Sequence, residues 1–206
     1  MAIRGDKLTE HILWTAKDVF LELGFERASM DVVATRAKAS KRTVYSHFEN
    51  KEKLFLAVIK LVRELFLSRL KLPSDYSDKP VEALTRFCGR YAEILLYESS
   101  VQMLRVSMAE SERFPEQAEQ YFDALFEEVH RRVSGYLKVT FEISSRSAAE
   151  ATDKLFSSIF YPRLIRALFG LEVLAKSFAQ EDLPPTYDLK LIRRAVNEVL
   201  KALPNS

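Results

Sequence analysis

The chain has 206 residues, and 48% of them are hydrophobic, which is enough to fill the core of one large or two small domains. No apolar run is long enough to span a membrane, and the start lacks the basic, apolar and small-residue pattern of a signal peptide. The single cysteine, Cys88, excludes an intramolecular disulfide framework and suits a reducing compartment. We therefore expect a cytoplasmic protein that does not bind a membrane.

Apolar residues recur at helical spacing along most of the chain, whereas the alternation typical of β-strands is scarce. We find no internal repeat, low-complexity tract or long linker. The sequence therefore predicts an all-α fold of about nine helices.

We expect residues 1–8 to form a short tail that is disordered from Met1 to Gly5. From about Lys7 to Leu23, apolar residues recur every three or four positions, which predicts an amphipathic helix. Gly24 then supplies a C-terminal stop signal for that helix.

Residues 29–53, SMDVVATRAKASKRTVYSHFENKEK, contain two short helical patterns, each with its own start signal. Ser29 can cap the first helix, and Ser40 can cap the second, whose buried face holds Val44 and Phe48. Helices this short are unstable alone, so they must pack against each other and against neighbouring elements. The stretch therefore predicts a helix-turn-helix.

The same region carries the positive charge of the protein. From Ala34 to Phe48 there is no acidic residue, and the basic residues are Arg36, Lys38, Lys41 and Arg42. From Glu52 onward acidic and basic residues balance, so the net charge of +2 arises before that position. A basic patch on a near-neutral protein suits a surface that faces phosphates. The plainer interpretation is an ordinary solvated helix with a half-buried tyrosine.

These residues resemble the N-terminal domain of TetR/AcrR-family transcriptional regulators. In that family the first helix ends at a Gly-aromatic pair, which Gly24 begins here. The family's I-A-x-x-A segment is matched by residues 33–37, VATRA, and its G-V-S-x-x-T-x-Y-x-H-F turn and recognition helix by residues 38–48, KASKRTVYSHF. A Lys-Glu pair that begins at Lys51 matches the start of the family's fourth helix.

The resemblance implies a three-helix, helix-turn-helix DNA-binding domain over residues 1–53 and a helical ligand-binding and dimerisation domain over residues 54–206. The residues implied to contact double-stranded DNA are Ser29, Ser40, Lys41, Arg42, Thr43, Tyr45, Ser46, His47 and Lys51. The family usually has Gly where Lys38 stands, in a turn that often needs a left-handed residue. Either this turn differs, or Lys38 tolerates the backbone strain and adds a basic group near phosphate.

Further helices are predicted over residues 51–70, 79–98, 101–112, 115–141, 147–169 and 187–203. Pro162 should kink the helix that contains it, and the Pro184-Pro185 pair marks a loop before the last helix. The last two helices carry more apolar residues than one compact monomer readily covers, so we expect a homodimer. The predicted interface residues are Leu155, Phe156, Ile159, Leu164, Ile192, Val196, Val199 and Leu200.

Residues 103–115, MLRVSMAESERFP, resemble the C-terminal part of the AefR-like branch of the family. Helices in this region of the family enclose an apolar cavity, which implies a small-molecule effector. Aromatic residues at helical spacing are most often plain core, but some should line such a pocket. The candidates are Phe87, Tyr91, Met103, Arg105, Phe114, Phe122 and Phe126. Because no cluster of charges accompanies these aromatic residues, we expect an apolar or aromatic effector.

The sequence contains no motif that predicts an enzyme: it has no Gly-rich phosphate loop, H-E-x-x-H, G-x-S-x-G or C-x-x-C. Glu127 and His130 have the spacing of one di-iron ligand pair, but there is no second copy, so we expect surface neighbours and neither metal nor cofactor. Cys88 could sense redox state only if it were exposed, and a lone helical cysteine is more often a small buried residue.

The sequence thus predicts a homodimeric DNA-binding transcriptional regulator, most simply a repressor that leaves a palindromic operator when a small apolar or aromatic molecule binds. The alternative is a helical ligand-binding or structural protein whose helix-turn-helix has decayed and no longer binds DNA. Lys38 slightly favours this alternative, whereas Thr43, Tyr45, His47 and Lys51 weigh against it.

Overall fold

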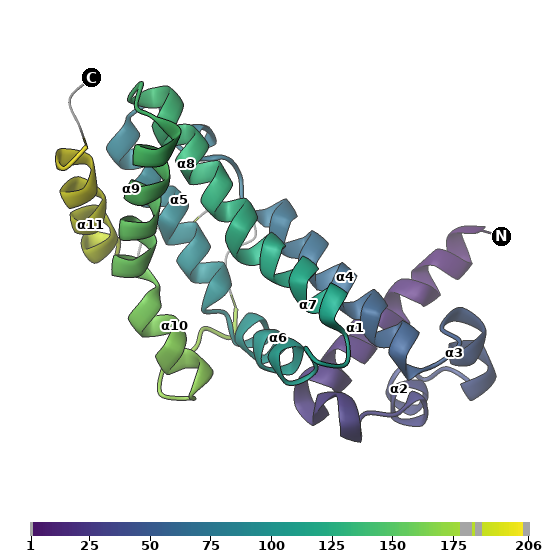
Figure 1. The fold of residues 1–206 in the computed structure, drawn as a ribbon. Coiled ribbons are helices and arrows are strands. Elements are labelled where there is room, and N and C mark those ends of the chain that lie inside the picture. Colours follow the sequence, from purple (N-terminus) through teal and green to yellow (C-terminus); the bar gives the residue numbers. More distant parts are fainter. Residues whose placement is uncertain (1, 178–182, 184–186, 204–206) are drawn as a thin grey trace. The chain divides into compact units, whose positions relative to one another are not determined.

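The computed structural model describes residues 2–177, 183 and 187–203, and over these residues the chain is helical with short connections (Figure 1). Their β pairing is confined to an isolated parallel bridge between Tyr97 and Ala175, so the predicted all-α class is confirmed. The elements are α1 (Ala2–Arg27), α2 (Met30–Arg36), α3 (Lys41–His47), α4 (Lys51–Arg69), the 3-10 turn η1 (Pro73–Asp75), α5 (Pro80–Leu95), α6 (Glu98–Ala109), α7 (Pro115–Phe122), the π segment η2 (Asp123–Glu127), α8 (Glu128–Thr140), α9 (Ser145–Ile159), α10 (Tyr161–Leu168) and α11 (Lys190–Lys201).

The start of α1 differs from the prediction. The helix begins at Ala2, ahead of the expected start near Lys7, while Met1 lies outside the described residues; disorder of the first residues stays a prediction. Once a helix is nucleated, each added residue gains a hydrogen bond, so it can extend beyond its first periodic apolar residue. Gly24 interrupts the helical geometry with φ 73° and ψ 170°, as its stop signal predicted, although the helix is continued to Arg27.

Two of the expected long helices are divided. The chain bends at Phe160, between α9 and α10, and Pro162 lies in the first turn of α10, where its missing N–H leaves no bond unmade. The predicted helix over residues 115–141 is interrupted by η2. These divisions account for the α-helices beyond the nine expected, and the 3-10 turn η1 is a separate addition. The Pro184-Pro185 loop lies outside the described residues.

The chain forms two compact units. Unit 1 contains Met1–Leu65 and Gln102–Tyr121, and unit 2 contains Phe66–Val101 and Phe122–Ser206. Unit 1 therefore includes most of α6 and α7 besides the helix-turn-helix. The domain boundary predicted at residues 53 and 54 stays a prediction.

Unit 1 is built around aromatic rings. Phe20 and Phe25 of α1 and Phe55 of α4 are each at most 1% exposed. The ring of Phe55 lies 5.0 Å from each of the other two rings, measured between centroids. Phe114, in the connection between α6 and α7, completes the cluster at 5.3 Å from Phe25 and 5.4 Å from Phe55. Burial of this much aromatic surface fixes α1 and α4 as the support on which α2 and α3 rest.

In unit 2, α8 and α9 pack together and α11 packs on both α5 and α9 (Figure 1). Tyr91 of α5 lies at the centre, 1% exposed, with its ring 4.7 Å from Phe160 and 5.7 Å from Phe156. Its hydroxyl donates a hydrogen bond of 2.9 Å to the carbonyl oxygen of Leu125 in η2. A π turn leaves its carbonyls less regularly paired than an α turn, so Tyr91 stabilises this irregularity from within the core.

The packing of unit 2 changes the interpretation of the predicted dimer residues. Leu155, Ile192, Val196 and Val199 are at most 6% exposed within their own unit. They are core residues of the monomer, because α11 directs its apolar face toward α5 and α9. The other four predicted interface residues are half-buried: Phe156, Ile159, Leu164 and Leu200.

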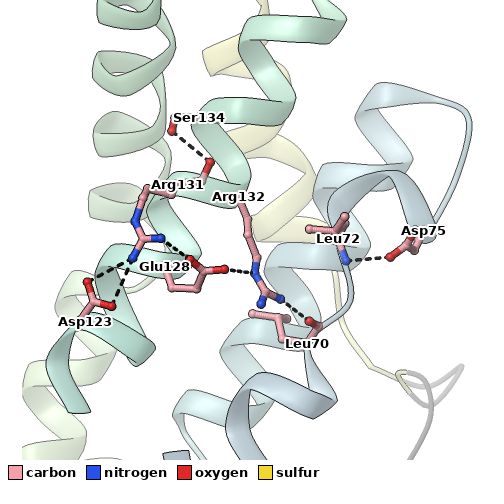
Figure 2. Close-up of polar contacts among 8 residues, drawn as sticks. All are labelled: Leu70, Leu72, Asp75, Asp123, Glu128, Arg131, Arg132 and Ser134. Carbon is pink, nitrogen blue, oxygen red and sulfur yellow. Dashed lines mark hydrogen bonds and ion pairs between the residues drawn. The ribbon is translucent and has the colours of Figure 1, made fainter. Parts of the chain in front are cut away.

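The chain at the C-terminal end of α4 is fixed by an arginine of α8 in unit 2 (Figure 2). Arg132 of α8 donates from Nη1 to the carbonyl oxygen of Leu70 and from Nε to Glu128 Oε1, 2.8 Å away. The other carboxylate oxygen of Glu128 accepts from Arg131, which also binds Asp123 in η2. A cation at a helix C-terminus satisfies carbonyls that have no partner within the helix. This ion-pair chain thus ties η2 and α8 to the end of α4.

We predict that Arg132→Met lowers the free energy of unfolding by about 1–3 kcal/mol, because the Leu70 carbonyl loses its donor while the aliphatic stem is kept. Arg131→Met is the matched control. Arg131 is 59% exposed against 18% for Arg132, so its loss should cost clearly less. Urea denaturation of the two variants measures the difference, and equal losses would contradict the capping role.

Candidate nucleic-acid interface

Helix α2 is seven residues long and is fixed at both ends by hydrogen bonds. At its start, Ser29 Oγ accepts from the backbone N–H of Val32 at 3.2 Å, as the sequence predicted. At its end, His11 Nε2 of α1 lies 3.2 Å from the carbonyl oxygen of Ala37. The next residue, Lys38, has φ 51°, so the turn keeps the left-handed residue that Gly usually supplies.

Helix α3 is also seven residues long. Ser40 Oγ accepts from the backbone N–H of Thr43 at 3.0 Å, and the two hydroxyl oxygens lie 2.7 Å apart. Val44 is fully buried and Phe48 is 8% exposed, which fixes the inner face of the helix as predicted. The N-terminus and the opposite face of α3 are therefore available to a ligand.

The outer face of α3 gathers the polar residues predicted to contact DNA. Arg42 and Tyr45 are exposed, and within the described part of the chain neither forms a hydrogen bond or an ion pair. Ser46 Oγ donates to the carbonyl oxygen of Thr43 at 2.7 Å, and His47 Nδ1 lies 3.1 Å from Thr9 Oγ1 of α1. Arg42 and Tyr45 can thus contact a partner without breaking an existing bond.

Other basic residues of this region are already paired. Lys41 Nζ lies 2.5 Å from Asp31 Oδ2 in α2, and both side chains are more than half exposed. Arg36 makes a two-pronged contact with Glu22 of α1, and this hydrogen-bonded guanidinium lowers the pKa of the Glu22 carboxyl. The folded structure thus divides a uniformly basic stretch into paired and unpaired cations.

Lys51 occupies a position that the sequence did not reveal. Its Nζ donates to the carbonyl oxygens of Phe25 and Glu26, at 3.0 and 3.3 Å, and lies 4.3 Å from the centre of the Phe25 ring. The ammonium group therefore caps the end of α1. Contact of Lys51 with DNA stays a prediction, but the observed bonds assign it a structural task.

Arg113 is the residue of this unit that the sequence analysis missed. It lies in the connection between α6 and α7, and it donates to Glu26 Oε1 at the end of α1 and to Glu52 Oε1 at the start of α4, both at 2.9 Å. Its guanidinium carbon also lies 4.5 Å from the centre of the Phe25 ring. The partners are 87 and 61 positions away, so periodicity and local motifs carried no signal for them.

The predicted pocket residues are divided between the two units, and their role in a pocket stays a prediction. In unit 1, Met103 is buried, Arg105 is exposed, and Phe114 belongs to the aromatic cluster of Phe25 and Phe55. In unit 2, Phe87 and Tyr91 are core residues. The rings of Phe122 and Phe126, also in unit 2, form a pair whose centroids are 5.0 Å apart. Phe122 is 53% exposed. Of the five aromatic candidates, Phe87 and Tyr91 are therefore core residues, whereas the other three are partly or largely exposed.

The remaining candidate groups have ordinary surroundings. His130 Nε2 lies 3.1 Å from Asp153 Oδ1, and in the described part of the chain we find no group of three His, Cys, Asp or Glu side chains placed to hold a metal ion. Cys88 is fully buried, and burial raises the pKa of its thiol, so it is not poised to react. Among the described helices none combines the length and the apolar character needed to cross a membrane.

The fold and this surface define a helix-turn-helix protein with a second helical part, and comparison with known proteins gives its family. Residues 12–58 match the model of the bacterial regulatory proteins of the tetR family, and residues 82–172 match that of the C-terminal domain of AefR-like transcriptional repressors. The chain belongs to the TetR family, with an AefR-like C-terminal part.

Individual relatives agree with this assignment. The HTH-type transcriptional repressor NicS of Pseudomonas putida is 34% identical over 84 residues, which cover 40% of this chain and 39% of NicS. A putative TetR-family regulator from Mesorhizobium loti has the same fold, with a TM-score of 0.72 at 23% identity over 97% of this chain and 96% of its own. The flavonoid-responsive regulator FrrA aligns with a TM-score of 0.66 at 26% identity, over 95% and 94% of the two chains.

We predict that Asp31→Asn strengthens binding to any DNA duplex and steepens its salt dependence by up to about one unit of log–log slope, because a negative charge is removed from this surface and Lys41 is left unpaired. Fluorescence anisotropy across a salt series measures both quantities. The matched control is Asp18→Asn in α1, which removes the same charge from a pair with Lys17. Weaker binding by Asp31→Asn would instead mean that the pair holds Lys41 in its binding position.

We predict that Arg113→Met lowers the free energy of unfolding by about 1–2 kcal/mol, because two ion pairs and a cation–ring contact are lost together. Arg146→Met is the control, since Arg146 makes a single pair with Glu150 and is 89% exposed. Arg146→Met should therefore lower the free energy of unfolding by much less than Arg113→Met. The stabilising role of the Arg113 contacts is contradicted if both variants have the same midpoint of urea unfolding.

Proposed function

We propose that this protein is a DNA-binding transcriptional regulator, a repressor that leaves its operator when a small apolar or aromatic molecule binds. The observation that carries the proposal is the outer face of α3, where Arg42 and Tyr45 are exposed and unpaired beside a capped N-terminus. A helix presented in this way can enter the major groove of DNA. The family assignment and the repressor named among its relatives support the same function.

The recognition helix divides its work between bases and phosphates. Arg42 and Lys41 lie in the first turn of α3, the part that enters the groove, and an arginine can bind guanine through two hydrogen bonds. Thr43, Tyr45 and His47 face the sugar-phosphate backbone and fix the position of the helix. The N-termini of α2 and α3 aid this contact, because the helix dipole favours negative charge there. Lys51 also belongs to the proposed phosphate contacts, and in the free protein it holds α1 against α4.

A homodimer would present two such helices to a palindromic operator. Unit 2 leaves apolar side chains uncovered on α10 and just beyond it, where Tyr161 is 67%, Ile165 40% and Phe169 78% exposed. These residues, next to the half-buried Leu164, replace the buried residues of α9 and α11 as the centre of the proposed dimer interface. Large uncovered apolar groups are typical of such interfaces.

The effector of this chain is proposed to be apolar or aromatic. The relative FrrA is named for its response to flavonoids, which supports an aromatic effector here as well. A ligand can change operator binding only if it prefers one arrangement of the reading heads over the other. The protein would act in the cytoplasm, where the DNA lies.

The alternative, a decayed helix-turn-helix, is not favoured. Both caps are made, the inner face of α3 is packed, and the turn keeps its left-handed residue even though that residue is Lys38. Decay would be expected to leave unpaired caps or polar residues on the buried face. The described helix-turn-helix shows neither.

Selection of bound fragments from random DNA tests the proposal and should yield a palindromic site. On that site, Arg42→Ala should weaken binding by about 1–3 kcal/mol and relax the preference at one base pair in each half. Lys60→Ala is the control, because Lys60 is 67% exposed in α4 of the same unit and away from α3. If no duplex is enriched by the wild-type protein, the proposed function is wrong. If Arg42→Ala loses the same factor of binding affinity on selected and on random DNA, the proposed base contact of Arg42 is wrong.

A further inference from the structure

Two residues other than glycine have a left-handed backbone in the described part of the chain: Lys38, with φ 51°, and Glu142, with φ 53°. Side chains with a Cβ disfavour this region, so such a residue persists only where the surrounding structure or a function retains it. Both lie just after a helix, Lys38 after α2 and Glu142 after α8. The two positions therefore carry a similar strain with opposite charges.

The geometry at Lys38 is imposed by the end of α2. The N–H of Lys38 donates to the carbonyl oxygen of Thr35 at 3.2 Å, and the N–H of Ala39 donates to that of Ala34 at 3.0 Å. These two bonds form a Schellman motif, which requires a left-handed backbone at the first of the two donor residues, here Lys38, and usually has glycine there. A glycine at position 38 would satisfy the same bonds with less strain. The backbone therefore does not require a lysine here, and what a glycine at this position would lack is the charged side chain.

The charges around Lys38 indicate what that side chain is available for. Of the neighbouring cations, Arg36 is bound to Glu22 and Lys41 to Asp31. Lys38 is exposed and, over the described residues, makes no ion pair or side-chain hydrogen bond. It lies in the turn between α2 and α3, two positions before Ser40, which caps the recognition helix. A duplex that accepts the first turn of α3 in its groove brings its phosphates close to this turn.

We propose that Lys38 contacts a backbone phosphate of the bound duplex and so supplies a sequence-independent part of the affinity, in exchange for a strained turn. This inference rests on the proposed function as a DNA-binding regulator. A lysine bound to phosphate displaces a condensed counterion, so its contribution depends on salt and not on base sequence. Lys38 is therefore an affinity residue, whereas Arg42 is a specificity residue.

The test compares Lys38→Gly, Lys38→Asn and Lys38→Arg with the wild-type protein on two duplexes of equal length, one selected from random DNA and one of random sequence. Lys38→Gly and Lys38→Asn should weaken binding to both by the same factor, about threefold to tenfold near 0.1 M salt, and reduce the salt slope by about one. Lys38→Arg keeps the charge and should keep both the affinity and the slope.

Thermal unfolding separates this loss of binding from a loss of folding. Lys38→Gly relieves the left-handed strain, so its Tm should equal or exceed that of the wild type while its DNA affinity falls. Glu142→Gly is the matched control, because it relieves the same kind of strain at the end of α8 in unit 2. It should change the Tm in the same direction and leave DNA binding unchanged.

The outcomes distinguish this inference from the proposed function. A wild-type protein that binds neither duplex, even at low salt, would overturn both. A wild-type protein that binds, with Lys38→Gly and Lys38→Asn showing the same affinity and salt slope, would overturn only the role of Lys38. A loss of affinity in Lys38→Arg equal to that in Lys38→Gly would show that the positive charge does not account for the affinity. That result would also overturn the proposed role of Lys38.

Discussion

Helices α2 and α3 have seven residues each, and helices of this length do not form stably on their own. Their existence therefore depends on packing against a rigid support. The support is the buried ring cluster of Phe20, Phe25 and Phe55, which joins α1 to α4, together with the serine caps that satisfy the first N–H groups of α2 and α3. The outer face of α3 is left exposed, because its inner face is buried through Val44 and the helix packs on α2.

Carboxylates of the same unit determine which cations of the basic region remain available. Glu22 and Asp31 each hold one cation of the stretch that reads as uniformly basic in the sequence, and the others stay unpaired. An exposed ion pair contributes little to stability, so these pairs matter more for the electrostatic pattern that a DNA backbone would meet. The positive surface is thus narrower than the composition suggests. It is centred on the turn after α2 and the first turn of α3.

Helix α4 is tied at each end by arginines that come from distant parts of the sequence. Near its start, Arg113 joins Glu52 to Glu26, and just beyond its end Arg132 binds the carbonyl of Leu70 (Figure 2). The first contact belongs to unit 1 and the second to unit 2, and the helix itself is continuous between them. The Arg132 contact extends through Glu128 to the π segment, an irregularity that often occurs at functional positions. Each unit therefore holds its own end of the one helix that both share.

The sequence by itself determined the helical class, both serine caps, the buried face of α3 and the stop at Gly24, because these features depend on residues within a few positions of each other. It also determined the region of the candidate site, since that region follows a local motif. The tertiary structure decided the partners of Lys41, Lys51 and Arg113, the place of Phe114, and which apolar residues of α9 and α11 are core. Those features depend on side chains that folding brings together from far apart in the chain. Helical periodicity shows that a face is apolar, but only the packed structure shows what covers it.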